Sequence, residues 1–216
     1  MPVPVKSTNL VYFPVPKVAC TSIKHALLNY NEDGRADWLS EARKTDKTLP
    51  NSHRVYPSEP LRPKHVLKYM GRRWFCVVRD PVRRFLSVYG NRVVHHNDLK
   101  SSEPALEQAG LPPRPDLDTF ATHLEVYCRT SRSIRHHARP IVDYLGRRPG
   151  RFDRIFRMSE LSGLRDYLAE AGAEIRLDHL QTGGPKLTPD DLPAPALERV
   201  KRFYASDYRS FGEWFD

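Results

Sequence analysis

The residues best suited to bind an anion stand near the start of the chain, where an apolar run is followed by a lysine and two hydroxyl side chains. Residues 10–15 are apolar and have the composition of a strand that ends before Lys17. Thr21 and Ser22 then open a pattern with helical spacing. The first N–H groups of a helix lack intrahelical partners and lie at the positive end of the helix dipole. We therefore predict an anion site in this strand–loop–helix segment, with Lys17 adding a charge and the hydroxyl groups adding donors.

Two known phosphate loops do not fit this segment. The nucleotide-triphosphate loop G-x-x-x-x-G-K-[ST] needs glycines, which are missing here, and its lysine follows the small residues instead of preceding them. A phosphatase loop has an arginine six positions after its cysteine, but the residue six after Cys20 is Ala26. We therefore interpret Cys20 as a small loop residue. Taken alone, the segment is more typical of a turn capped by Thr21 or Ser22 beside a solvated lysine.

A second group of anion-binding side chains follows another strand. Residues 73–78 form a compact aromatic and β-branched run, the pattern of a strand buried in a parallel sheet. Asp80-Pro81 then supplies the N-cap and first position of a helix, on which Arg84 and Ser87 share a face. Arg79, Arg84 and Ser87 could converge near one strand edge, where Arg79 and Ser87 are suited to bind a phosphate. The alternative is a solvated arginine face on this helix and an ion pair at Arg79.

Both segments resemble elements of the sulfotransferases that use 3′-phosphoadenosine 5′-phosphosulfate (PAPS). Pro16-Lys17-Val18-Ala19-Cys20-Thr21 is similar to their 5′-phosphosulfate loop, and is closest to the branch that acts on carbohydrates (sulfotransferase family 2). Residues 79–89 match each position of their 3′-phosphate motif: arginine, proline, a second arginine, serine and tyrosine. Residues 203–212 resemble the Tyr-x-x-Asp-Tyr-x-x-Phe-Gly ending of the carbohydrate branch, and residues 137–140 resemble its His-x-Arg-Pro element.

This resemblance implies a PAPS-dependent sulfotransferase that transfers a sulfuryl group to an acceptor hydroxyl, with a carbohydrate as the expected acceptor, and releases 3′,5′-bisphosphoadenosine (PAP). It implies a single domain over residues 1–216 with the P-loop-kinase-like sulfotransferase fold, a three-layer α/β/α arrangement around a mainly parallel sheet. The cofactor-binding residues that it implies are Lys17, Val18, Ala19, Cys20, Thr21, Ser22, Arg79, Ser87 and Lys186. His137 and Arg139 are the candidates for contacting an anionic acceptor. Little of the resemblance covers residues 31–64 and 97–130, so the acceptor stays open.

Histidine is the expected base for this reaction. Sulfuryl transfer requires a base for the hydroxyl proton and positive charge at the bridging oxygen, and Lys17 supplies that charge. His65 precedes the second strand, the place of the basic histidine in sulfotransferases; the alternative is a surface histidine in a basic loop. The pairs His95-His96 and His136-His137 have no cysteine or carboxylate at ligand spacing, so no metal site is predicted.

The alternation of strand and helix patterns predicts an α/β fold whose ligands bind at the carboxyl ends of the strands. Besides the two strands above, we predict strands at residues 152–158 and 175–177. Predicted helices lie at residues 23–30, 81–89, 117–127, 134–145 (broken at Pro140), 160–171 and 195–208. Residues 37–63 and 98–115 are predicted to be irregular, and residues 181–188 to form a glycine-containing loop.

Composition limits the remaining possibilities. The net charge of +9 indicates an anionic partner. Three cysteines cannot all pair, which favours a reducing compartment, and no stretch resembles a signal peptide or a membrane span, so we expect a cytoplasmic protein. A nucleotide kinase is the first alternative, although the loop lacks glycines and no magnesium-binding pattern is recognisable. A nucleic-acid-binding protein is the second, but no base-stacking or groove-reading motif is present, so no nucleic-acid partner is expected.

Overall fold

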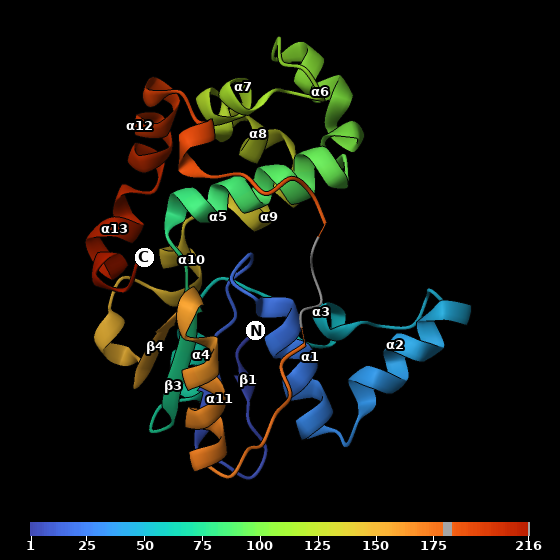
Figure 1. The fold of residues 1–216 in the computed structure, drawn as a ribbon, viewed down its shortest axis with the longest axis vertical. Helices are drawn as coiled ribbons and strands as arrows, with labels where there is room; N and C mark the ends of the chain where they lie inside the picture. Colours follow the sequence, from blue (N-terminus) through green and yellow to red (C-terminus); the bar gives the residue numbers. More distant parts are fainter. Residues whose placement is uncertain (179–182, 216) are drawn as a thin grey trace. The chain divides into compact units, whose positions relative to one another are not determined.

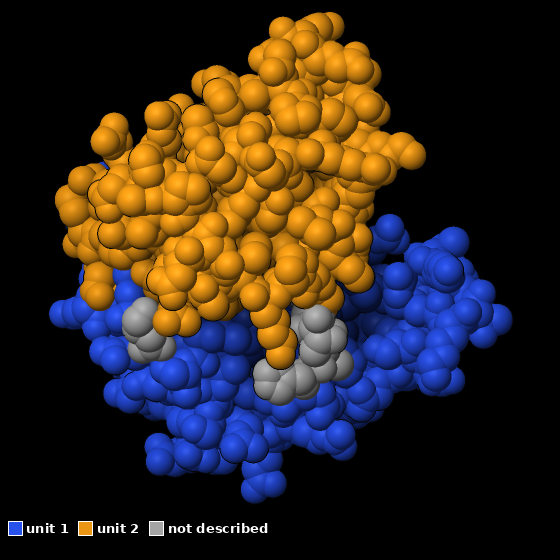
Figure 2. Space-filling model, turned by 45° about the horizontal axis from the view of Figure 1, so that its top comes forward, with its two compact units in different colours: residues 1–78, 143–181, 213–216 blue, residues 79–142, 182–212 orange. Residues whose placement is uncertain are grey.

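The computed structural model describes residues 1–178 and 183–215 of the 216-residue chain. The chain forms two compact units, which Figure 2 shows in different colours. The first unit comprises residues 1–78, 143–181 and 213–216, and the second comprises residues 79–142 and 182–212. All strands of the described residues belong to the first unit.

A four-stranded sheet forms the centre of the first unit (Figure 1). In spatial order its strands are β1 (Val3–Pro4), β2 (Leu10–Tyr12), β3 (Arg73–Val78) and β4 (Arg154–Arg157). The pairs β2–β3 and β3–β4 are parallel, whereas β1 is antiparallel to β2. The predicted α/β fold with a mainly parallel sheet is confirmed. The segments that follow β2 and β3 therefore both leave from the carboxyl ends of adjacent parallel strands, where α/β proteins bind ligands.

One face of the sheet is covered by α11 (Leu161–Glu170). The ring of Tyr167 in this helix packs against Phe75 of β3 and Phe156 of β4, with centroid distances of 5.7 and 5.5 Å. Phe75 and Phe156 point to the same side because Val77, two residues after Phe75, pairs with Phe156.

The opposite face carries a second aromatic group at the end of α4 (Pro63–Lys68). Trp74 points away from the side occupied by its neighbour Phe75 and stacks on Phe13 at a centroid distance of 4.4 Å. Its indole N–H donates a 2.8 Å hydrogen bond to the carbonyl of Tyr69, which ends α4. Helical segments thus lie on both faces of the sheet, as a three-layer arrangement requires.

The region predicted to be irregular at residues 37–63 contains helices, so that prediction is wrong in part. The helices that follow β2 are α1 (Cys20–Asn31), α2 (Arg35–Thr45) and α3 (Ser52–Val55). Within α2 only Ala36 and Leu39 are buried, and they pack with Leu28. Two apolar positions are too few to show a helical period in the sequence. The Asn51 side chain caps α3 by accepting hydrogen bonds from two backbone N–H groups. This cap is difficult to recognise in the sequence because the surrounding residues are also polar.

The strand predicted at residues 175–177 is also wrong, since this segment forms no strand or helix. The Arg176 side chain is exposed and forms a 2.8 Å ion pair with Asp178. Alternation over three residues was too short a signal to specify pairing in a sheet.

The second unit is built from helices around a core that includes Phe85, Phe120 and Tyr127. Its main helices are α5 (Pro81–Val88), α6 (Glu103–Gln108), α7 (Leu117–Thr122), α8 (Leu124–Thr130), α9 (Arg132–Ala138), α12 (Ala194–Phe203) and α13 (Ala205–Phe211), and α10 (Ile141–Leu145) follows α9. A π-helical segment extends α5 over Tyr89–His95, and 3₁₀ turns of this unit lie at Asp98–Ser102 and Pro189–Asp191. The 3₁₀ turns at Pro149–Arg151 and Met158–Glu160 belong to the first unit, and that at Gly212–Trp214 lies where the chain passes between the units. The predicted break at Pro140 is confirmed. The irregular prediction for residues 98–115 is wrong where α6 forms. The predicted helices over residues 117–127 and 195–208 are each divided in two.

Candidate active site

The loop between β2 and α1 has the backbone geometry of an anion-binding nest. Lys17 and Ala19 both adopt left-handed backbone conformations, with φ of 69° and 56°, and Val18 between them does not. Alternation of this kind turns successive N–H groups toward one side. Left-handed conformations are unfavourable for residues with a Cβ atom and are concentrated at ligand-binding sites. The loop therefore combines backbone strain with a geometry that is suited to an anion.

The start of α1 differs from a turn capped by its N-cap side chain. Ala19 is the N-cap residue, it has no polar side chain, and no side-chain cap bond forms at this position. The N–H of Ile23 donates to the Ala19 carbonyl at 3.1 Å. The positive end of α1 therefore begins at the nest.

A buried polar network lies behind the loop, and the sequence interpretation missed it. The Thr21 hydroxyl is 2.8 Å from Nε2 of His53, which lies on α3. Nδ1 of the same ring is 3.4 Å from the Nζ atom of Lys24, and this Nζ donates to Ser58 Oγ at 2.7 Å. Lys24 is fully buried on α1. The sequence contains one indication of this burial. Lys24 follows Ile23 and precedes the apolar pair Leu27-Leu28 by one turn, a spacing that places the lysine on the buried face of the helix.

His65, the predicted base, is a buried residue that helps to begin α4. Nδ1 of the ring accepts a 3.2 Å hydrogen bond from the Arg62 N–H, and Nε2 lies 3.8 Å from a Glu59 carboxylate oxygen. The ring is 5% exposed. The pKa of His65 lies below its usual value of 6.5. Burial is the largest cause, and the positive charge of the nearby Met1 amino group is the second. The unprotonated ring, the form that a base requires, is therefore favoured at neutral pH.

The lowered pKa predicts a pH-dependent stability. Below pH 6.5 the unfolded chain binds a proton that the native ring resists, so the free energy of unfolding should fall as the pH drops toward the folded-state pKa. His65→Asn keeps an acceptor for the Arg62 N–H and removes the titration. Chemical denaturation between pH 7 and about pH 5 should show a shallower loss for His65→Asn than for wild type. Parallel curves would mean that the ring titrates alike in both states.

In the second unit, Arg79 and Ser87 flank the first turns of α5. The Asp80 side chain caps this helix as predicted, accepting from the Arg83 N–H at 2.9 Å, and its other oxygen accepts from the Tyr208 hydroxyl at 2.9 Å. Arg79 is partly buried, and burial together with the neighbouring Arg83 lowers its pKa. A guanidinium stays charged under such a shift, and desolvation strengthens its attraction for an anion.

The loop that carries Lys186 packs against the helix one turn after Ser87. Gly184 has a φ of 98°, and a Cβ atom on it would overlap the carbonyl of Gly90. A Cβ atom on Gly90 would lie 2.9 Å from the Pro185 carbonyl oxygen. The two glycines thus allow backbone-to-backbone contact, and Lys186, which is exposed, follows directly. Residues 181 and 182 of the predicted glycine-containing loop lie outside the described residues.

Arg84, which the sequence pattern places on the same helical face as Ser87, is a structural residue. It is fully buried, and its guanidinium donates to the carbonyls of His137 (2.9 Å), Ala138 (3.4 Å) and Arg139. The Tyr204 hydroxyl donates to the Ala138 carbonyl at 2.6 Å, and the guanidinium lies over the Tyr204 ring.

The buried Asp207 completes this cluster. Its carboxylate accepts from the N–H groups of Ile141 and Val142 at 2.8 and 3.0 Å. Three separate motifs of the sequence therefore meet in one cluster: Arg84, residues 137–140 and residues 203–212. The side chains of His137 and Arg139, the predicted acceptor contacts, are both partly exposed beside it.

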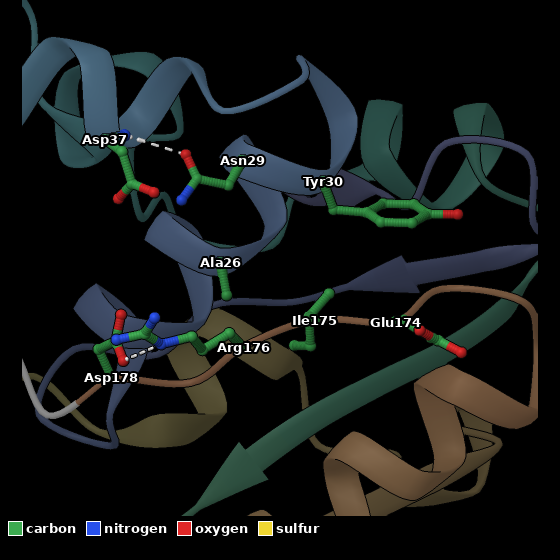
Figure 3. A pocket seen from close by; sticks show the side chains of 8 residues that line it. All are labelled: Ala26, Asn29, Tyr30, Asp37, Glu174, Ile175, Arg176 and Asp178. Atoms are coloured by element: carbon green, nitrogen blue, oxygen red, sulfur yellow. Dashed lines mark hydrogen bonds and ion pairs between the residues drawn. The ribbon is translucent and has the colours of Figure 1, made fainter.

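A pocket of about 280 Å³ adjoins the network behind the loop. It lies among α1, α2 and α3, and its polar side is lined by Thr21, His25, Arg43 and His53 together with Ser40, Asn51 and Ser52, whereas Ala36 and Leu39 supply an apolar part. A second pocket, of about 500 Å³, lies at the other end of α1 (Figure 3). Asp37, Glu174 and Asp178 line that pocket together with one cation, Arg176, which is ion-paired with Asp178 at 2.8 Å. Carboxylates outnumber cations in this lining, so it is less suited to a phosphate or sulfate group than the amino-terminal end of α1.

The fold and the loop define a class of protein that binds an anionic group at the carboxyl end of a parallel strand. Within that class, the family model described as the sulfotransferase family matches residues 5–214, nearly the whole chain. The chain therefore belongs to the sulfotransferase family, and it is a transferase. A search of curated proteins and a search of solved structures returned no match.

Two searches of the structure returned nothing. None of the described helices has the length and apolar character needed to cross a bilayer. In residues 1–178 and 183–215 no three His, Cys, Asp or Glu side chains form a metal-binding group. The absence of a metal from the reaction remains a prediction.

Proposed function

We propose that the protein transfers a sulfuryl group from PAPS to an acceptor hydroxyl, most readily that of a carbohydrate. The observation that carries this proposal is the strained nest at residues 17–19, which leads into a helix with an alanine at its N-cap, in a chain of the sulfotransferase family. PAPS supplies an activated sulfuryl group on a 5′-phosphate and carries a 3′-phosphate for recognition. The described residues include one set of anion-binding groups suited to the 5′-phosphosulfate of this nucleotide and a second set suited to its 3′-phosphate.

The 5′-phosphosulfate is assigned to the loop of residues 17–22. Backbone N–H groups of the nest and the positive end of α1 bind the phosphate oxygens. Lys17 stabilises the charge that develops on the oxygen between phosphorus and sulfur. These positive groups replace the divalent metal that a kinase uses, so the proposed reaction needs no metal.

The 3′-phosphate is assigned to Arg79 and Ser87, with Lys186 as a third contact. Partial burial of the Arg79 guanidinium favours pairing with an anion. The contact between Gly184 and Gly90 holds the Lys186 loop one helical turn from Ser87. Each of these three side chains donates hydrogen bonds and none requires a metal.

His65 is the proposed base. Nε2 of its ring faces the Glu59 carboxylate, which can hold the proton on Nε2 and leave the lone pair on Nδ1. That lone pair accepts the Arg62 N–H in the structure, so His65 must give up this contact to take the acceptor proton. Catalytic hydrogen bonds often form only in the substrate complex.

The acceptor is assigned to the pocket among α1, α2 and α3. Its hydroxyl, amide and imidazole groups suit the hydroxyls of a sugar, and Arg43 and His25 suit an acidic substituent. His137 and Arg139 remain the acceptor contacts that the family resemblance implies.

Matched variants of two arginines four residues apart test the nucleotide assignment. Arg79→Ala should weaken PAP about tenfold to a hundredfold, the range for losing a charged hydrogen bond, and should hardly affect adenosine 5′-phosphosulfate, which lacks the 3′-phosphate. Arg83→Ala removes an exposed charge from α5, the helix that follows Arg79, and should change neither affinity much. Titration calorimetry gives both values. Equal losses for the two nucleotides in Arg79→Ala would refute the assignment.

A further inference from the structure

Lys24 is a buried cation without a carboxylate partner. Its side chain is fully buried, and in the described part of the chain its hydrogen-bonding contacts are Ser58 Oγ at 2.7 Å and His53 Nδ1 at 3.4 Å. A buried lysine is normally paired, because desolvation of an unpaired ammonium is unfavourable. Lys24 lies one helical turn after Thr21, on the same side of α1. Its place beside the anion loop therefore calls for a functional explanation.

The chemistry of these groups fixes the direction of each hydrogen bond. An ammonium only donates, so the His53 Nδ1 atom that faces it must accept. The single ring proton of neutral His53 is then on Nε2, which donates to the Thr21 oxygen 2.8 Å away. The Thr21 hydroxyl forms no other hydrogen bond with the described residues, so its own proton stays available to a further acceptor.

We propose that Lys24 is a positioning residue that keeps His53 neutral with its proton on Nε2, and thereby makes Thr21 a hydrogen-bond donor to the anion in the loop. The role of the anion rests on the proposed function, whereas the proton arrangement does not. A second proton on His53 would face the ammonium at 3.4 Å and is therefore disfavoured.

The charges around Lys24 are consistent with this role. Burial lowers its pKa, and the nearby Cys20 thiol acts in the opposite direction when it ionises. The amino group of Met1 lies within electrostatic reach, since Lys24 contributes to its lowered pKa. The titratable groups that face Lys24 are thus Cys20 on α1, His53 on α3 and the Met1 amino group. A dianion bound in the loop would favour the charged form of Lys24.

Nitrogen-resolved NMR of the histidine rings in the nucleotide-free protein tests the proton arrangement directly. In wild type at neutral pH, His53 should be neutral with its proton on Nε2. In Lys24→Met, which removes the donor to Nδ1 and keeps an apolar chain of similar length, His53 should shift toward the Nδ1–H form or toward the charged ring. A wild-type ring that carries its proton on Nδ1, or two protons, would overturn the proposal even if the variant does not fold.

A double-mutant cycle with PAP tests the consequence for binding. Lys24→Met and Thr21→Val should each weaken PAP about tenfold, and the double variant should lose little more than either single one, because both changes remove the same donor. Lys44→Met is the matched control for the loss of one charge, since Lys44 is exposed on α2, and its PAP affinity should be close to wild type. Additive losses would show that Lys24 acts through its charge alone and would overturn the positioning role. Failure of wild type to bind PAP would refute the proposed function and leave the NMR result as the test of the proton arrangement.

Discussion

Replacing His65 with alanine should lower the turnover of a verified acceptor by about a hundredfold to ten-thousandfold, the usual effect of removing a positioned base. The affinity for PAP should stay near that of wild type, because the base acts on the acceptor hydroxyl and not on the nucleotide. The lowered pKa of His65 adds a second expectation. The rate should fall with decreasing pH only below the usual histidine value of 6.5. Steady-state kinetics across pH, with PAP calorimetry on the same samples, measures both.

His53→Ala is the matched comparison for this prediction. His53 contacts Thr21 in the loop, so its loss should weaken PAP and should lower turnover less than His65→Ala does. The opposite pattern, with turnover lost in His53→Ala and retained in His65→Ala, would transfer the role of base to His53. Retention of turnover in both would make His137 the next residue to test.

Replacing Arg84 with methionine should lower the free energy of unfolding by about 3 kcal/mol or more. The variant removes the hydrogen bonds from the guanidinium to the carbonyls of His137 and Arg139, and a hydrogen bond that involves a charged group contributes about 1.5–3 kcal/mol. The loss of contact with the Tyr204 ring adds to this effect. Urea denaturation measures the change.

Arg83→Met is the control for the Arg84 variant, because it removes the same charge from an exposed position on the same helix. Its unfolding free energy should lie within about 0.5 kcal/mol of wild type. A small effect of Arg84→Met combined with a large loss of PAP affinity would contradict the structural role of Arg84 and would return it to the anion site.

The Arg84 cluster also explains why three motifs far apart in the sequence occur together. Arg84 and Tyr204 both bond to the backbone of residues 137–139, and Asp207 holds the N–H groups of the next two residues after Pro140. The division between α12 and α13 falls at Tyr204 itself. A sequence pattern reveals that such residues recur together, but it does not separate ligand contacts from buried supports.

Local signals in the sequence were sufficient for the elements that carry the loop and the arginine motif. Asp80-Pro81 marks the start of α5, and the buried runs before Lys17 and Arg79 give adjacent parallel strands. The left-handed backbone at Lys17 and Ala19 could not be predicted, because neither residue type favours it and the surrounding fold must impose it. His53 reaches Thr21 only through α3, a helix that depends on the Asn51 cap within a polar region. Contacts of this kind between distant segments leave no periodic trace in the sequence.

Titration calorimetry of the wild-type protein with PAP in the presence of EDTA tests the central claim most directly. The proposed function predicts that PAP binds without a divalent metal, more tightly than adenosine 5′-monophosphate and more tightly than ATP with magnesium. Binding of ATP that requires magnesium, with no detectable binding of PAP, would contradict it and would favour a kinase.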